Sequence, residues 1–260
     1  MTSAQTHFRN GDLQAALAAI SEELRTDPGH LGKRTFLAEL LCIQGEFERA
    51  DRQLEILLSL DQQALLTVGT WRQLIRAAQA RHEVFTQGRV PDMVDAPSPR
   101  IRTLLDIGLA LREGRAADAA AAADALEQAR APCPVVANGS AVDDLRDLDD
   151  LCAGILEVLS TTGKYYWVDM EQVESLRFQR AERPLDQLWR RARLILRDGT
   201  DGEVFIPAIY PGAEDDAARL GRRTDWQDLG GLVRGQGLRT WLVGDEAVPL
   251  SEIDSIEAAA

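Results

Sequence analysis

Hydrophobic residues recur at helical spacing through the first half of the chain, and several matched positions lie one fixed distance apart. The pairs are Gly11 and Gly45, Ala16 and Ala50, Ile20 and Leu54, Leu24 and Leu58, and Asp27 and Asp61. Their displacement of 34 residues is the period of the tetratricopeptide repeat, a helix–turn–helix unit. The alternative is two unrelated amphipathic hairpins of similar length. The repeat is favoured because several chemically matched positions keep one period.

Further helical patterns follow, but the period drifts. Residues 70–85 have helical spacing, although Gln79 stands where the next repeat glycine would fall. Prolines and glycine interrupt residues 88–99, and a second helical hairpin is then predicted from residues 101–112 and the alanine-rich residues 116–130. The sequence therefore predicts a helical domain over residues 1–131.

Turn residues dominate residues 131–140 and predict a domain junction, with a second domain over residues 140–260. After this junction, leucines and isoleucines recur every three or four residues over residues 141–161, which predicts an amphipathic helix packed on a sheet. Residues 165–168 are aromatic and predict a strand. Residues 170–178 are expected to form a short helix, because Asp169 and Gln172 fit a helix-starting cap.

The remaining chain alternates between apolar and polar residues in short runs. Ala192, Leu194 and Leu196 alternate with a second set of residues, namely Arg191, Arg193, Ile195 and Arg197. Two Asp-Gly turns precede a second apolar run at residues 204–210, which predicts a β-hairpin. A third run at residues 238–243 and a fourth from Ala247 complete a mostly antiparallel sheet. The fold class is thus α + (α+β): an N-terminal tetratricopeptide-like helical repeat domain followed by a small C-terminal domain.

Composition narrows the function classes. The chain has 260 residues, 45% of them hydrophobic, and a formal net charge of −13, which disfavours binding to nucleic acid or to anionic membranes. No apolar run approaches the roughly 18 residues needed to cross a bilayer, and no leader is recognisable, so a cytoplasmic protein without membrane insertion is expected. The three cysteines are far apart and are expected to be reduced thiols.

Several phrases together resemble a known family. They are Asn138-Gly139, the acidic residues 143–150, Leu156-Glu157-Val158, residues 163–168, residues 183–193, residues 220–226 and residues 233–246. This set resembles the ImpE/SciE/TagJ family of bacterial type VI secretion accessory proteins, with one departure at Asp169, where the family's proline is expected. The resemblance implies a non-catalytic, cytoplasmic adaptor. Its partners would be the small subunit of the contractile sheath, bound through a short helical segment, and the AAA+ ATPase that recycles the sheath. A sheath-subunit folding or assembly factor, or a general protein-interaction scaffold, is the alternative.

Two sets of residues are candidates for partner contacts. In tetratricopeptide-like arrays the first helix of each pair commonly faces a concave groove, and here those helices carry His7, Arg9, Arg34 and Glu39. The C-terminal candidates are Arg222, Trp226, Arg234 and Arg239. With Arg190, these arginines could form an anion or acidic-peptide site, but internal pairing with Asp186, Asp225, Asp228 and Asp245 is favoured because carboxylates are abundant nearby.

No cofactor, metal site or catalytic residue is predicted. Asp143, Asp147 and Asp150 would share one face of the predicted helix, which raises a divalent-cation hypothesis. Acidic residues near a helix start are more often a solvated, dipole-stabilised face, so the metal hypothesis is the weaker one. All three histidines lie in the repeat region, away from the distinctive C-terminal segments, so a nucleophile–histidine pair has little support.

Overall fold

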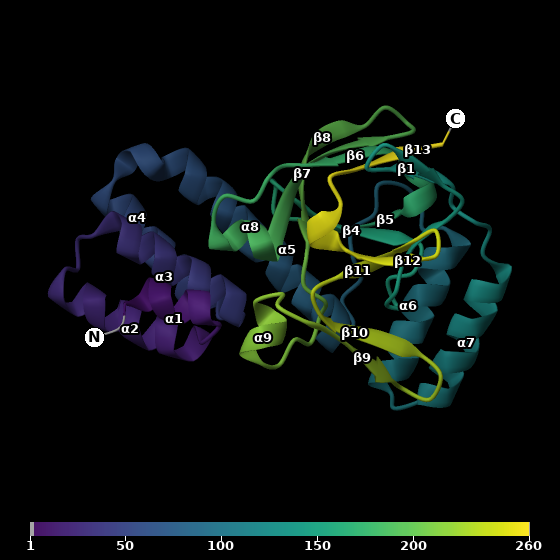
Figure 1. Ribbon diagram of the computed structural model, residues 1–260, viewed down its shortest axis with the longest axis horizontal. Helices are drawn as coiled ribbons and strands as arrows, with labels where there is room; N and C mark the ends of the chain where they lie inside the picture. Colours follow the sequence, from purple (N-terminus) through teal and green to yellow (C-terminus); the bar gives the residue numbers. More distant parts are fainter. Residues whose placement is uncertain (1–2, 260) are drawn as a thin grey trace.

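The computed structural model describes residues 3–259, with helices in the first half of the chain and antiparallel sheets in the second (Figure 1). The helices are α1 (Ala4–Asn10), α2 (Leu13–Thr26), α3 (Leu31–Gln44), α4 (Phe47–Leu60), α5 (Leu65–Gln87), α6 (Pro99–Arg112) and α7 (Ala116–Ala129). The predicted fold class, a helical region followed by an antiparallel α+β region, is confirmed.

The spacing seen in the sequence is also present in the backbone. Helix α4 begins 34 residues after the start of helix α2 and ends 34 residues after its end. Gly11 and Gly45 occupy the same place, one residue beyond α1 and α3, with φ of 88° and 84° that glycine adopts without a Cβ clash. Ala16 and Ala50 are fully buried where the helices approach one another. The assignment of these pairs to the tetratricopeptide class stays a prediction.

Helix α5 breaks the pattern. Gln79 cannot end the helix as a glycine would, so α5 continues for 23 residues until Gly88, where φ is 76°. The C-terminal part of α5 packs on β4 and β5, and its N-terminal part packs on α4. The next helix, α6, pairs with α7 at the other end of the molecule (Figure 1).

One large antiparallel sheet organises the second half, in the strand order β2-β1-β13-β6-β7-β8-β4-β5. Its strands are β1 (Val135–Ala137), β2 (Ser140–Val142), β4 (Ile155–Ser160), β5 (Tyr165–Asp169), β6 (Val173–Phe178), β7 (Trp189–Leu196), β8 (Asp201–Pro207) and β13 (Ser255–Ala258). The predicted hairpin is β7–β8, in which Ala192 lies opposite Val204.

Two smaller sheets and two short helices complete the fold. Strands β9 (Thr224–Asp228) and β10 (Val233–Gly237) pair with each other, and β11 (Thr240–Val243) lies between β12 (Glu246–Pro249) and β3 (Leu145–Asp147). The short helices are α8 (Pro184–Leu188) and α9 (Asp216–Arg219). Residues 235–237 form the end of strand β10.

Two predicted helices are wrong. Residues 141–161 form the end of β2, then β3, β4 and connecting turns. A helix was predicted because β4 is buried on both faces and its continuous apolar run resembles that of a buried helix. The aspartates before β4 bind backbone N–H groups and so stabilise turns: Asp147 accepts from the N–H of Asp149, which in turn accepts from that of Leu151. Residues 170–178 form one 3₁₀ turn followed by strand β6.

The helices and the sheet share a hydrophobic core. One apolar cluster joins α1–α7 to one face of the sheet, through residues such as Ile155, Leu159 and Trp189, and a second fills the opposite face around Trp241 and Leu250. The predicted boundary between residues 131 and 140 stays a prediction. Within residues 3–259, no helix combines the length and the apolar character that a membrane crossing requires.

Candidate functional site

The chain's own C-terminal half covers part of the helical region where a peptide groove was expected. Helices α8 and α9 pack against α3. Arg183, before α8, approaches Glu39 with 3.7 Å between Nε and Oε1. Arg222, after α9, donates from Nη2 to the backbone oxygens of Phe8 and Arg9, both at 2.8 Å. A ligand could lie along this face of α3 only by displacing α8 and α9.

The candidates on α3 have internal partners. Arg34 donates to the side-chain oxygen of Gln53 at 2.7 Å and to the backbone oxygen of Pro28 at 2.5 Å. Glu39 is 4% exposed, and burial raises its pKa to about 7 although Arg183 opposes the shift. The outer candidates His7 and Arg9 remain at least partly accessible on α1. A partner-binding role for these residues stays a prediction.

The C-terminal arginines pair internally, as predicted, but not with the predicted carboxylates. Asp186, Asp225, Asp228 and Asp245 form no hydrogen bond or ion pair with Arg190, Arg222, Arg234 or Arg239 in the described chain. Arg190 binds the backbone oxygens of Leu250 and Ile253 instead. The actual partners lie in segments distant in sequence, which local spacing cannot indicate.

Glu157 on β4 is the centre of a buried charge network. Arg81 of α5 donates to both its oxygens, from Nε at 2.7 Å and from Nη2 at 3.1 Å, and Arg239 and the Tyr165 hydroxyl donate to it as well. Burial alone would raise the pKa of Glu157, but Arg81 and Arg239 outweigh burial and hold it well below its usual range. This contact ties helix α5 to the sheet.

Two further carboxylates extend the network to the small sheets. Asp147 accepts from Nη1 of Arg239 and from the hydroxyl of Tyr210, both at 2.6 Å. Asp149 accepts from Nε of Arg234 and from the backbone N–H of Gly235, both at 2.9 Å. Both aspartates are fully buried. The network therefore fixes β3, β4 and β10 relative to one another.

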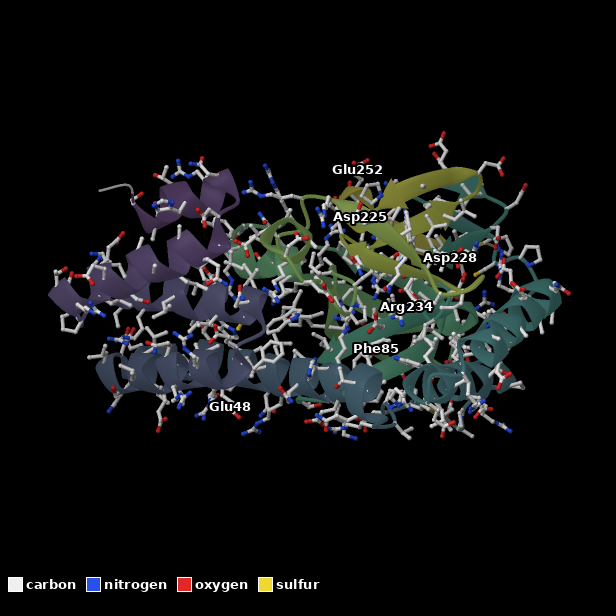
Figure 2. All side chains as sticks on the ribbon, turned by 90° about the horizontal axis from the view of Figure 1, so that it is seen from below. Glu48, Phe85, Asp225, Asp228, Arg234 and Glu252 are labelled. Atoms are coloured by element: carbon white, nitrogen blue, oxygen red, sulfur yellow. The ribbon has the colours of Figure 1, made fainter. Side chains whose placement is uncertain are left out.

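A cleft of about 660 Å³ lies beside this network, between the α3–α4 turn, α5, the segment after β8 and strand β10. Its lining includes Phe47, which stacks on Trp189 with 6.4 Å between ring centres, and Phe85. The guanidinium carbon of Arg234 lies 5.7 Å from the Phe85 ring centre, and Figure 2 shows the two side chains next to each other. Apolar surface with converging polar groups is typical of a recognition site.

The rim of this cleft is polar and accessible. His82, Gln227 and Glu214 are exposed there, and Gln236 is half-buried. The predicted candidate Trp226 adjoins it: the residue is 43% exposed, and its ring centre lies 5.9 Å from that of Tyr210. Of the predicted candidates, Arg234 therefore lines the cleft and Trp226 neighbours it, whereas Arg239 is buried in the network beneath.

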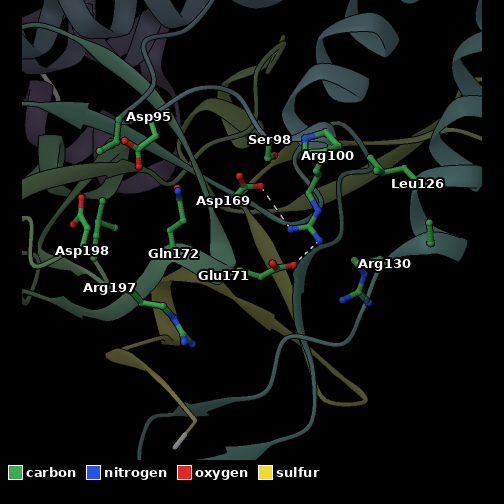
Figure 3. A pocket seen from close by; sticks show the side chains of 14 residues that line it. Asp95, Ser98, Arg100, Leu126, Arg130, Asp169, Glu171, Gln172, Arg197 and Asp198 are labelled. Carbon is green, nitrogen blue, oxygen red and sulfur yellow. Dashed lines mark hydrogen bonds and ion pairs between the residues drawn. The ribbon is translucent and has the colours of Figure 1, made fainter.

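A second cleft, of about 770 Å³, lies between the start of α6, the end of α7 and the turn after β7 (Figure 3). Arg100 spans part of it, with Nη2 2.7 Å from Glu171 and Nη1 3.7 Å from Asp169. Burial raises the pKa of Asp169, against the effects of Ser98 and Arg100. Because its central charges pair with one another, this cleft offers less for a protein ligand than the aromatic one.

The structure does not bring together the three aspartates on which the divalent-cation hypothesis depends. Asp143 is exposed, Asp147 is buried in the network, and Asp150 accepts from the backbone N–H of Val233 at 2.6 Å, so the three do not share a helix face. Among residues 3–259, no group of three or more His, Cys, Asp or Glu side chains could hold a metal ion. Burial raises the pKa of the Cys42 thiol to about 12.

Arg81 and Glu157, which link the helices to the sheet, were not predicted from the sequence. One signal was present: Glu157 stands alone inside the apolar run of residues 155–159, and a lone charge in such a run requires a buried partner. The identity of that partner could not be read locally, because Arg81 lies 76 residues earlier in the chain.

These features define an α + (α+β) protein in which paired helices and an antiparallel sheet enclose an aromatic cleft. The family profile described as ImpE protein matches residues 139–257. The chain is 33% identical over 255 residues to the type VI secretion system accessory component TagJ of Pseudomonas aeruginosa, covering 96% of this chain and 90% of that protein. The crystal structure of protein VPA1032 from Vibrio parahaemolyticus superposes with a TM-score of 0.94 at 30% identity, covering 100% of this chain and 98% of that one. This chain therefore belongs to the ImpE/TagJ family of type VI secretion accessory proteins.

Proposed function

We propose that this protein is a non-catalytic adaptor of the type VI secretion system. It binds the small subunit of the contractile sheath and links it to the AAA+ ATPase that recycles the sheath, and it acts in the cytoplasm without a cofactor. Membership of a family of secretion accessory proteins supports the general role. The observation that carries the specific proposal is the aromatic cleft beside the buried charge network.

The cleft suits a segment of the sheath subunit better than the face of α3 does. Phe47 and Phe85 give apolar surface for a side chain of the segment, and the polar rim with Arg234 would fix its register. Binding there needs no displacement of α8 or α9. The exposed ring of Trp226 would extend the contact beyond the cleft.

The test is calorimetric titration of the full chain with the purified small sheath subunit. Gln227→Trp fills the cleft rim and His82→Glu adds a charge to it, and we expect each to weaken binding by roughly tenfold or more. Gln128→Trp is the matched control, because Gln128 is exposed on α7 and lies outside the cleft. Unchanged affinity in both rim variants would show that the segment of the sheath subunit does not bind in the cleft.

Addition of the ATPase separates the adaptor from the folding-factor alternative. An adaptor should co-elute with the sheath subunit and the ATPase as one ternary complex in size-exclusion chromatography. A folding or assembly factor should instead leave the sheath subunit when sheath assembly starts. Failure of the full chain to bind the sheath subunit at all would count against both the adaptor and the folding-factor function.

A further inference from the structure

The hydrogen bonds of the β9–β10 hairpin decide which backbone groups of β9 are used. The N–H of Leu229 donates to the backbone oxygen of Leu232 at 2.8 Å, and that of Leu238 donates to the backbone oxygen of Arg223 at 2.9 Å. Hydrogen-bonded and non-hydrogen-bonded pairs alternate along an antiparallel ladder, so the odd-numbered residues of β9 direct their N–H and C=O groups to β10. The even-numbered residues direct theirs away from β10.

The even-numbered residues of β9 leave an open strand edge. The N–H and C=O groups of Thr224, Trp226 and Asp228 have no hydrogen-bond partner among residues 3–259. Residues 225–228 are all exposed, so the described chain leaves this strand open to solvent. We name the outward N–H and C=O groups of these three residues the β9 edge.

Other strand edges of the molecule are protected. Beside β5, the backbone N–H of Asp92 donates to Tyr165 at 2.8 Å, and its carbonyl accepts from Trp167 at 3.1 Å. Strand β12 ends in Pro249, which has no N–H group, and β2 has only three residues. Native proteins cover, shorten or block strand edges in these ways because an open edge is a template for pairing with another chain. The β9 edge is therefore suited to such pairing.

The charges along β9 indicate which kind of strand fits. Asp228 is exposed and has no ion-pair partner among residues 3–259; its Oδ1 accepts from the backbone N–H of Gly231 at 2.7 Å. Asp225 pairs with Arg223, which pairs with Asp215 as well. Three carboxylates thus surround one guanidinium, and the net charge of −13 on the chain has the same sign. Opposite charges stabilise cross-strand pairs and like charges destabilise them, so a basic strand is favoured.

Trp226 adds apolar surface at the centre of the edge. It lies opposite Gly235 of β10 and packs on Tyr210, and 43% of it is exposed. Residues that lie opposite each other on paired strands direct their side chains to the same face, roughly 5 Å apart. An apolar residue opposite Trp226 on an added strand would therefore cover the exposed part of the indole ring.

We propose that the β9 edge binds an extended, basic segment of a partner protein, which adds to β9 as an antiparallel strand. Every second residue of the segment exchanges backbone hydrogen bonds with Thr224, Trp226 and Asp228. The residue opposite Asp228 is lysine or arginine, and the residue opposite Trp226 is apolar. The antiparallel direction is favoured because its pairing is slightly more stable per residue. This pairing uses backbone groups of β9, so it does not depend on the sheath ligand proposed for the cleft.

The test uses a designed ten-residue peptide with threonine at every second position and lysine or valine at the others. Fluorescence anisotropy with the full chain should show roughly threefold or tighter binding than for the same peptide with glutamate in place of lysine. Methylation of the backbone nitrogens of the lysine and valine residues removes the N–H groups that face β9 and should weaken binding by roughly threefold or more. Methylation of the threonine nitrogens, which point away from β9, is the matched control and should have little effect.

A substitution in the protein tests the charge preference. Asp228→Asn removes the charge but keeps an oxygen that accepts from the N–H of Gly231. It should reduce the preference for the lysine peptide over the glutamate peptide by roughly threefold. Glu48→Gln is the matched control, because it also removes one exposed carboxylate, on α4, and Figure 2 shows Glu48 well apart from Asp228. This variant should keep the preference.

Hydrogen exchange followed by NMR identifies the paired groups. In the free chain the N–H groups of Asp225 and Gln227 should exchange slowly, because they donate to β10, and those of Trp226 and Asp228 should exchange rapidly. The lysine peptide should slow exchange at Trp226 and Asp228. Equal binding of the two methylated peptides, no binding at millimolar peptide, or protection only outside β9 would overturn the proposal. Protection of Trp226 in the free chain that increases with protein concentration would also overturn it, because the edge would then pair with a second copy.

Discussion

Replacement of Arg239 by methionine tests whether the buried network holds the fold together. Arg239 is 1% exposed and donates to Asp147, to Glu157 and, from Nε at 3.1 Å, to the backbone oxygen of Pro207. Methionine keeps much of the length and apolar volume but removes every donor. Two buried carboxylates and one carbonyl then lose a partner.

The expected loss of stability depends on which hydrogen-bond donors each buried carboxylate keeps in the variant. Glu157 keeps both donors of Arg81 and the hydroxyl of Tyr165. Asp147 keeps only neutral donors, among them the Tyr210 hydroxyl, and no cation. Removing one partner of a buried ion pair costs roughly 3–5 kcal/mol, a large share of the roughly 5–15 kcal/mol that stabilises a typical protein.

The pH dependence has a definite sign. Burial already raises the pKa of Asp147 to about 6, although Arg239 opposes the shift, and removal of Arg239 should raise it further. A carboxyl whose pKa is higher in the folded state binds protons more tightly there, so stability rises as the pH falls through that range. The Arg239→Met variant should therefore lose more stability at pH 8 than at pH 5.

Urea unfolding followed by tryptophan fluorescence at both pH values measures this difference. Arg193→Met is the control, because the Arg193–Asp201 pair is 67% and 39% exposed in its two side chains and should contribute no more than about 1 kcal/mol. A loss below about 1 kcal/mol for Arg239→Met at pH 8, or an equal loss at both pH values, would refute the reasoning.

Three further outcomes are expected. Glu39→Gln should stabilise the protein at pH 8 by roughly 1–3 kcal/mol and have little effect at pH 4.5 in urea titrations, because burial raises the Glu39 pKa to about 7 and its charged form is the unfavourable one. Gly235→Ala should lower the free energy of unfolding by roughly 1–3 kcal/mol, since the added Cβ would lie 2.3 Å from the Tyr210 ring, whereas Gly202→Ala meets no atom within 4 Å and should change it little. Iodoacetamide should label the half-buried Cys133 first, with mass spectrometry as the readout, because the other two thiols are buried.

The sequence predicted those elements correctly whose defining residues lie close together along the chain. The helical pairs could be predicted because the caps at Gly11 and Gly45 and the small residues Ala16 and Ala50 recur at one spacing along the sequence. The β7–β8 hairpin could be predicted because buried and exposed residues alternate along most of β7 and the turn to β8 is short. The helix predicted for residues 141–161 is wrong because β4 is buried on both faces, so its apolar residues do not alternate with polar ones.

The candidate site depended on contacts that the sequence does not display. Internal pairing of the arginines was foreseeable from the abundance of carboxylates, but Arg234 and Arg239 reach partners 85 and 92 residues away. Helix α3 needs an apolar surface to pack on α2 and α4, so its pattern gives no indication that α8 and α9 pack against it as well. Only the topology of the second half brings these helices onto α3.

Helix α5 joins the aromatic cleft to the rest of the helical array. It packs on α4, and His82 near its C-terminal end lines the cleft. Arg81 fastens the cleft end of α5 to Glu157 of the sheet, so the helix cannot shift there without breaking a buried ion pair. The walls that α5 and the second half of the chain give to the cleft are therefore held in place before any ligand binds, which lowers the cost of ordering a recognition surface.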